Sequence, residues 1–239
     1  MGIINPEKYS LQSFEQHERE VFKDTYRDYI SMNLTQPISY QEWLVMNNYG
    51  ILFGTQESVL EKKTSTRSKP NKGIFVNSII KGDILINKKF KTGLIGHIAI
   101  MADDNYAIEL PGGKGWFLGI ADNNRLVSKD VWFDEYGSGW TTVYRCPYKE
   151  VADSASDWAY RHYYNPSGGN IKTIHTRYKI NLDFQSTNPS YCSKLVVQAF
   201  FYNDRPVISQ ADIRRLVISP IRVPSYFKPP YNLVVVGKY

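Results

Sequence analysis

Residues 188–200, which read NPSYCSKLVVQAF, are the stretch that most strongly indicates the fold. Asn188 suits an N-cap and Pro189 suits the first helical position, so a helix is expected over 190–203 with Cys192 in its first turn. The free N–H groups and the dipole of a helix start stabilise negative charge, which a nucleophilic sulfur needs. A buried core cysteine is the alternative interpretation, since free cysteines are among the most buried residues.

A second stretch supplies a base for such a nucleophile. Residues 96–100 read GHIAI and residues 107–109 read AIE, on either side of the turn ADDN at 102–105. This pattern predicts a β-hairpin of 95–101 with 106–110. His97 and Glu109 then share one face of the hairpin as diagonal neighbours. A carboxylate in that place would orient the imidazole and support its protonated form, so Cys192, His97 and Glu109 are the candidate catalytic residues.

Four short motifs, in this order, carry a family resemblance: GDILI (82–86), GHIAI (96–100), AIE (107–109) and YCSKL (191–195). Together they resemble the circularly permuted NlpC-type, YiiX-like papain-fold cysteine hydrolases, in which the histidine strand precedes the cysteine helix. The resemblance covers about 73–237. It implies an α+β fold with a papain-like antiparallel sheet or barrel packed on the cysteine helix. It also implies Cys192 as nucleophile, His97 as base and Glu109 as the orienting residue.

The resemblance further implies hydrolysis of an amide or peptide bond, with a peptidoglycan stem peptide as a possible substrate and with no metal or organic cofactor. The backbone N–H of Cys192 is expected to contribute to an oxyanion hole. Four further positions are expected to bind substrate: Tyr191, Gly96, Gly112 and Gly113. The last two belong to PGGKG, residues 111–115, which lacks the ending of a phosphate-binding loop and is interpreted as a turn.

The first 72 residues have a different pattern. Apolar residues at a spacing of three to four predict a helix over 10–34, and Ser39 with Glu42 forms a capping box that opens a second helix. Residues 62–72 are polar, contain a proline and predict a linker. We therefore divide the chain into a helical N-terminal appendage with its linker, 1–72, and a catalytic domain, 73–239. Short strands are predicted after the linker, beginning with 74–80 and 83–87.

Two other functions stay open at this stage. Permuted relatives include lipid acyl hydrolases and acyltransferases, although these usually carry a second histidine where Glu109 stands. A non-catalytic binding module is the other possibility, because the run from Lys62 to Lys91 is strongly basic and would suit an anionic wall polymer. Nucleic acid is an unlikely partner, since that run has only Phe75 and Phe90 for base stacking.

Composition sets the outer limits. The chain has 239 residues, 42% of them hydrophobic, and a formal net charge of +6. No apolar run approaches the roughly 18 residues of a membrane span. Two cysteines make no disulfide framework, and Cys146 is expected to be a buried structural thiol. No signal peptide is visible at the N-terminus, which by itself favours the cytoplasm only weakly; we expect a secreted or envelope-associated protein whose leader has been removed, with a cytoplasmic location also open.

Overall fold

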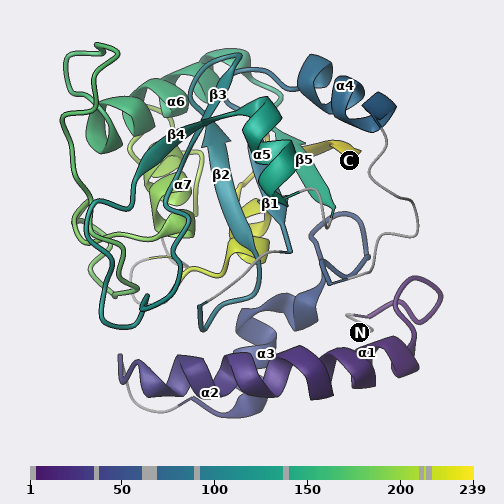
Figure 1. Cartoon of the computed structure of the whole chain (residues 1–239). Helices are drawn as coiled ribbons and strands as arrows, with labels where there is room; N and C mark the ends of the chain where they lie inside the picture. Colours follow the sequence, from purple (N-terminus) through teal and green to yellow (C-terminus); the bar gives the residue numbers. More distant parts are fainter. Residues whose placement is uncertain are drawn as a thin grey trace.

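The computed structural model describes residues 4–34, 38–60, 69–88, 92–136, 140–209, 213 and 217–239. Its centre is an antiparallel six-stranded sheet in the order β4-β3-β2-β1-β5-β6 (Figure 1). The strands are β1 (Ile84–Asn87), β2 (His97–Met101), β3 (Tyr106–Glu109), β4 (Arg125–Ser128), β5 (Thr141–Arg145) and β6 (Val234–Lys238). The sheet is open, with β4 and β6 as its edges, so the predicted α+β class is confirmed and the sheet does not close into a barrel.

Helices lie on both faces of this sheet and below it. They are α1 (Leu11–His17), α2 (Lys23–Ser31), α3 (Tyr40–Met46), α4 (Lys69–Ser78), α5 (Lys129–Tyr136), α6 (Lys149–Tyr163) and α7 (Cys192–Phe201). A π-helical turn (Glu18–Phe22) joins α1 to α2, and two 3₁₀ segments occupy Asn48–Gly50 and Pro220–Tyr226. No helix among the described residues is long and apolar enough to cross a membrane.

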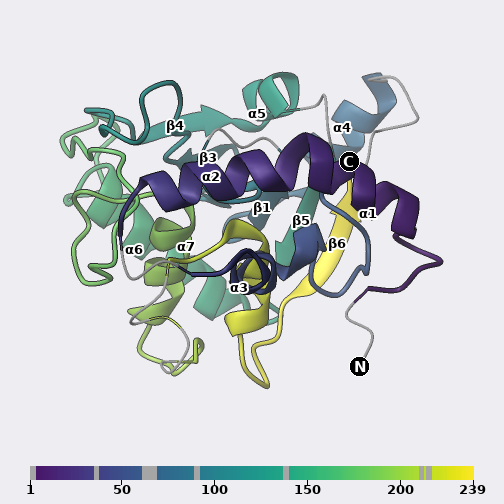
Figure 2. The ribbon, with the colours of Figure 1, turned by 90° about the horizontal axis from the view of Figure 1, so that it is seen from below.

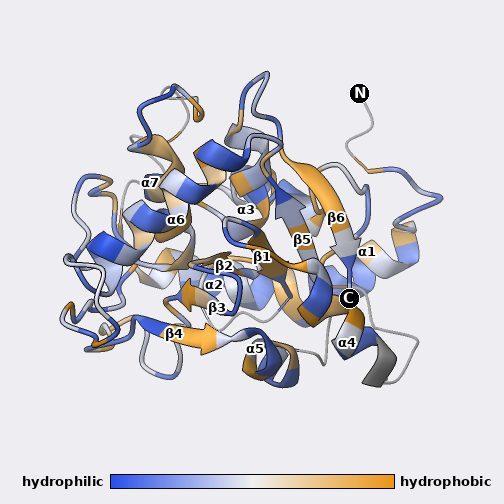
Figure 3. Cartoon of the chain, turned by 90° about the horizontal axis from the view of Figure 1, so that it is seen from above, coloured by the Kyte–Doolittle hydropathy of each residue, from blue (hydrophilic) through white to orange (hydrophobic). Residues whose placement is uncertain are grey.

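The period of two along each strand divides the core between the two faces of the sheet. Ile84 and Ile86 of β1 belong to the larger hydrophobic cluster, which includes the inner sides of α6 and α7. Leu85 belongs to a smaller cluster with residues of α4 and α5. Figure 3 shows the resulting pattern, with hydrophobic residues along β1 and hydrophilic residues on α6. The cysteine helix therefore packs on one face and α5 covers the other.

The N-terminal helices pack against the larger cluster. Phe22 and Trp43 are completely buried in it, and Phe14 and Tyr26 pack against it from partly buried positions. Trp43 also donates its indole N–H to the carbonyl of Gly93, at 3.2 Å. Figure 2 shows α1 and α2 as one continuous rod across this end of the molecule. The N-terminal segment thus supports the loop that leads into β2.

The strand predicted for residues 74–80 is wrong, because this part of the chain lies largely in α4. Phe75 lies within α4, and Ile79 directly follows its last residue; both are buried in the smaller cluster. Residue 72 lies inside α4. Residues 69–72 of the predicted linker therefore belong to a helix, and residues 62–68 lie outside the described part of the chain. The division of the chain at residue 72 stays a prediction.

Candidate active site

Cys192 is the first residue of α7, and Tyr191 is its N-cap. The cap predicted at Asn188 is therefore wrong. Residues there stay extended because Ser190 exchanges backbone hydrogen bonds with the segment 177–179, and the side chain of Asn188 accepts the backbone N–H of Arg177 at 3.0 Å. The later start leaves the backbone N–H of Cys192 at the free end of the helix, where it has no partner within the helix.

The hairpin places the two other candidate residues in contact. Register pairs Ile100 with Ile108 and Met101 with Ala107, so His97 and Glu109 are diagonal neighbours on one face, as predicted. His97 Nε2 lies 2.6 Å from Glu109 Oε2. Gly96, directly before His97, has a φ of +87°, which a side chain rarely adopts. The backbone turns there to bring His97 to the very start of β2.

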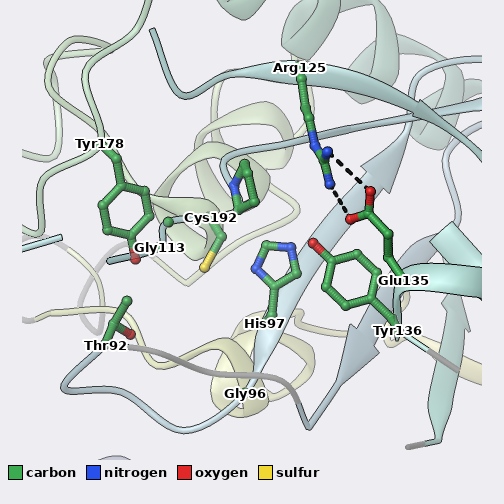
Figure 4. A pocket seen from close by; sticks show the side chains of 11 residues that line it. Thr92, Gly96, His97, Gly113, Arg125, Glu135, Tyr136, Tyr178 and Cys192 are labelled. Atoms are coloured by element: carbon green, nitrogen blue, oxygen red, sulfur yellow. Dashed lines mark hydrogen bonds and ion pairs between the residues drawn. The ribbon is translucent and has the colours of Figure 1, made fainter. Parts of the chain in front are cut away.

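His97 also interacts with Cys192, and the two side chains face each other in Figure 4. Because Nε2 bonds to Glu109, the other ring nitrogen, Nδ1, is the one available to the sulfur. Burial of the ring lowers the pKa of His97, but hydrogen bonds with Cys192 and Glu109 and the charge of Glu109 outweigh it and raise the pKa to about 9. The imidazole is therefore held ready to carry a proton at neutral pH.

Glu109 is completely buried, and three side chains satisfy its carboxylate. Besides His97, Tyr136 Oη donates to Oε2 at 2.9 Å and Arg125 Nε donates to Oε1 at 2.7 Å. Burial raises the pKa of Glu109, but the hydrogen bond and charge of His97, with Arg125, lower it below its usual value. Arg125 is in turn paired with Glu135, at 2.6 Å (Figure 4). Glu109 is thus held ionised, as an orienting carboxylate must be.

Arg125, Tyr136 and Glu135 were not predicted from the sequence. Arg125 stands directly opposite Glu109 in the pairing of β3 with β4. The rings of Tyr136 and Trp132, both from α5, stack on His97 at centroid distances of 5.3 and 5.6 Å. These contacts fix the plane of the imidazole, and they come from elements that follow the hairpin.

A cavity of about 210 Å³ opens in front of Cys192. Its lining residues are Thr92, Gly96, His97, Pro111, Gly112, Gly113, Arg125, Glu135, Tyr136, Tyr178 and Cys192. Figure 4 places Tyr178 across from the His97 ring, with its hydroxyl toward Thr92. Burial, and then the charge of Cys192, raise the pKa of Tyr178 well above its usual value, so its hydroxyl stays a donor. Sequence reasoning missed Tyr178 as well.

Of the four residues predicted to bind substrate, three lie at this cavity and one does not. Gly96, Gly112 and Gly113 line it. The side chain of Tyr191 is instead buried in the core, where its hydroxyl accepts the backbone N–H of Ile218 at 3.1 Å. The alternation of the extended chain before α7 turns Tyr191 inward, so the placement gives no support to a substrate contact there.

Two other predictions concern groups away from the cavity. Cys146 and Cys192 are both free and buried, as predicted for Cys146. In the basic run from Lys62 to Lys91, two described lysines are ion-paired: Lys72 with Asp134 at 2.8 Å and Lys81 with Asp157 at 2.6 Å. Residues 62–68 and 89–91 of that run lie outside the described residues. Within the described ranges, no group of three or more His, Cys, Asp or Glu side chains is placed to hold a metal ion.

Comparison with known proteins bears on the chemistry. Residues 44–239 match the family described as "Lipoprotein N-acylation protein LnsA-like". An uncharacterized 30.3 kDa protein of Bacillus thuringiensis is 31% identical over 206 residues, which span 84% of this chain and 72% of that protein. No solved structure matches. The family description names acylation, which favours the acyl alternative over the peptide hydrolysis that sequence analysis placed first, and it makes no reference to NlpC-type enzymes. The chain belongs to the family of LnsA-like lipoprotein N-acylation proteins.

Proposed function

We propose that the chain is a cysteine acyl enzyme that takes a fatty acyl group from an ester lipid onto Cys192 and passes it to an amine or to water. The observation that carries the proposal is the buried set of interacting side chains Cys192, His97 and Glu109. Cys192 and His97 line the cavity, and the imidazole next to the sulfur has a pKa of about 9. Membership of an acylation family supports an acyl group as the group that is transferred. A peptidase would use the same three residues, so the substrate distinguishes the two.

In the first step, Cys192 transfers its thiol proton to His97 Nδ1 and its sulfur attacks the ester carbonyl carbon. The carbonyl π-bond opens, and the resulting oxyanion receives the backbone N–H of Cys192. The hydroxyl of Tyr178, on the facing wall, supplies a second donor. The oxyanion then reforms the carbonyl, the ester C–O bond breaks, and the leaving alkoxide takes the proton from His97. The products are an acyl-cysteine thioester and a free alcohol.

In the second step, the acceptor attacks the thioester. An amine or a water molecule loses a proton to His97 as its nitrogen or oxygen bonds to the acyl carbon, and the sulfur leaves and recovers that proton. Transfer to an amine gives an amide, and transfer to water gives a fatty acid. Glu109 holds the ring through Nε2 during both steps and stabilises its charged form. The family description supports a lipoprotein amine as the acceptor and the cell envelope as the place of action.

The size of the cavity fits this chemistry. At about 210 Å³ it lies below the range of pockets that enclose a drug-sized ligand, roughly 300–1,000 Å³. It therefore accommodates a reacting ester and the atoms next to it, whereas long acyl chains must extend beyond it. The order of the elements, with the histidine strand before the cysteine helix, supports a permuted papain-like arrangement as the finer description of the fold.

The test is to trap the acyl-cysteine. Purified chain is incubated with a phospholipid that carries two fatty acyl chains and, separately, with a peptidoglycan stem peptide, and each mixture is analysed by intact-protein mass spectrometry. We expect a mass increase of one acyl group with the lipid, located on Cys192 by peptide mapping and released by hydroxylamine, and no adduct in Cys192→Ala. Cleavage of the peptide without any acyl adduct would overturn the proposal and restore the peptidase.

A further inference from the structure

The turn that lines one side of the cavity continues into an exposed apolar tip. Gly112 and Gly113 border the cavity. Three residues later Trp116 is buried in the larger hydrophobic cluster, whereas Phe117 and Leu118, which follow it, are 57% and 67% exposed. We refer to residues 114–119 as the docking loop. Exposing two large apolar side chains at consecutive positions of a loop is unfavourable in free energy unless another surface covers them.

The loop is held in this shape by its own turns and by a neighbour. Leu118 donates its N–H to the Gly115 carbonyl at 3.0 Å, and Gly119 donates to Trp116 at 3.1 Å. Arg177 donates to the carbonyl of Leu118 at 2.5 Å and lies so close to Gly119 that a Cβ there would be 2.4 Å from its Nε. Trp116 anchors the loop from inside. The exposed tip is therefore held in a defined conformation beside the cavity.

The two paired stretches of chain next to the tip carry charges of one sign. The stretches 111–121 and 173–182 run beside each other through the pairing of Ile120 with Tyr178, and neither contains an acidic residue. They contribute three exposed cations, Lys114, Arg177 and Lys179. Two exposed acidic residues directly follow the stretches: Asp122, which pairs with Lys172 and His175, and Asp183, which accepts the backbone N–H groups of Gln185 and Ser186. An apolar tip with a surround of cations matches the chemistry of an anionic membrane surface, where apolar side chains enter the acyl boundary and cations meet headgroups.

We propose that the docking loop attaches the protein to an anionic phospholipid bilayer by inserting Phe117 and Leu118, with Lys114, Arg177 and Lys179 on the headgroups. Docking there places the mouth of the Cys192 cavity at the bilayer surface, so that an ester bond near the headgroup level reaches the sulfur while the acyl chains stay in the membrane. The inference deepens the proposed function by naming how its lipid substrate is presented. The attachment itself is a binding event that requires no chemistry at Cys192.

The experiment is flotation of the full-length chain with vesicles of phosphatidylcholine alone or mixed in equal parts with phosphatidylglycerol. We expect binding to the mixed vesicles that falls several-fold as salt is raised, because screening weakens headgroup contacts. Phe117→Ser with Leu118→Ser should weaken it by at least about tenfold, since two inserted side chains are lost. The matched control is Leu11→Ser with Phe53→Ser, a leucine and a phenylalanine that are also exposed, at 70% and 45%, and that should bind like the parent.

A second variant tests the same inference if the first variant does not fold. Lys114→Gln with Lys179→Gln retains the apolar tip, and it should lose affinity for the phosphatidylglycerol vesicles while the thermal unfolding midpoint is unchanged. Cys192→Ala should bind vesicles like the parent, so failure of the acyl-transfer proposal would leave this result standing. Equal vesicle binding by the loop variant and the parent would overturn the inference. If the parent does not bind vesicles but self-associates, and the Phe117→Ser, Leu118→Ser variant loses that self-association, the inference is overturned and the loop instead binds a second copy of the chain.

Discussion

The two cysteines of this chain have the same burial and opposite surroundings. Cys192 is 5% exposed and Cys146 is 2% exposed, and neither forms a disulfide. Cys192 begins a helix and contacts the imidazole of His97. Cys146 follows β5, where burial, followed by the negative charge of Glu150, raises the pKa of its thiol. Burial therefore does not distinguish the candidate nucleophile from the other thiol; the sign of the neighbouring charge and access to the cavity do.

The largest expected effect comes from exchanging each sulfur. Cys192→Ala should abolish acyl-enzyme formation, a loss of roughly 10⁴-fold or more in rate, because the covalent step has no other nucleophile. Cys146→Ala, the matched control, should leave the rate within about twofold of the parent. The rate of acyl-adduct formation is measured by mass spectrometry of the intact protein. Equal losses in the two variants would remove the distinction between the thiols.

Removal of the base should have the next largest effect. His97→Ala deletes the group that takes and returns the proton, and a loss of roughly 10³-fold in acylation rate is expected. Iodoacetamide labelling at about neutral pH provides an independent measurement, since modification of Cys192 should slow in this variant while Cys146 stays almost unlabelled. Unchanged labelling of Cys192 would mean that the imidazole does not activate the sulfur.

Glu109→Gln should have a smaller effect, because this residue acts through His97. We expect a loss of roughly 10²-fold in rate and a fall in the pKa of His97 from about 9, since the neutral amide no longer stabilises the imidazolium. NMR titration of the His97 ring measures that shift directly. A purely structural role for Glu109 would lower the stability of the protein and leave the titration of any folded fraction where it was.

The same pKa predicts a pH dependence of stability. The folded value for His97, about 9, lies above the unfolded value of about 6.5, so its contribution is complete below about pH 6.5 and is lost as pH rises through about 9. The contribution is on the order of 3 kcal/mol in the free energy of unfolding. Urea unfolding of the parent and of His97→Gln across this pH range measures it. A parallel pH dependence in the two proteins would contradict the shift.

Tyr136→Phe should have the smallest effect. It removes one hydrogen bond to a buried carboxylate that keeps two other partners, so we expect a loss of about 1–3 kcal/mol in the free energy of unfolding and at most about tenfold in rate. Tyr160→Phe is the control, since it removes a hydroxyl that bonds the Gly169 carbonyl near the surface. A rate loss as large as that of Glu109→Gln would make Tyr136 a participant in the reaction itself.

Much of the site could be predicted because it depends on local regularities. The hairpin follows from two apolar runs around a polar turn, and the period of two fixes which residues share its face, so His97 and Glu109 followed directly. Arg125 and Tyr136 could not be found in this way. Arg125 lies in β4, which a long loop separates from β3, so no short turn fixes its register opposite Glu109. Tyr136 lies on α5, and only the packing of that helix against the hairpin brings it to His97 and Glu109.

Periodicity over a few residues was enough to predict the α+β class, the contact between His97 and Glu109 and a helix near Cys192. The first residue of that helix depends on tertiary contacts, since the pairing of residues 177–179 with Ser190 overrides the capping preference of Asn188. Tertiary contacts also favour the helix α4 (Lys69–Ser78), because Phe75 within it and Ile79 directly after it are buried together in the smaller cluster. Contacts between segments far apart in the chain carry no local signal. The cavity and the side chains that bond Glu109 are formed by such contacts, and Arg177 holds the docking loop by another.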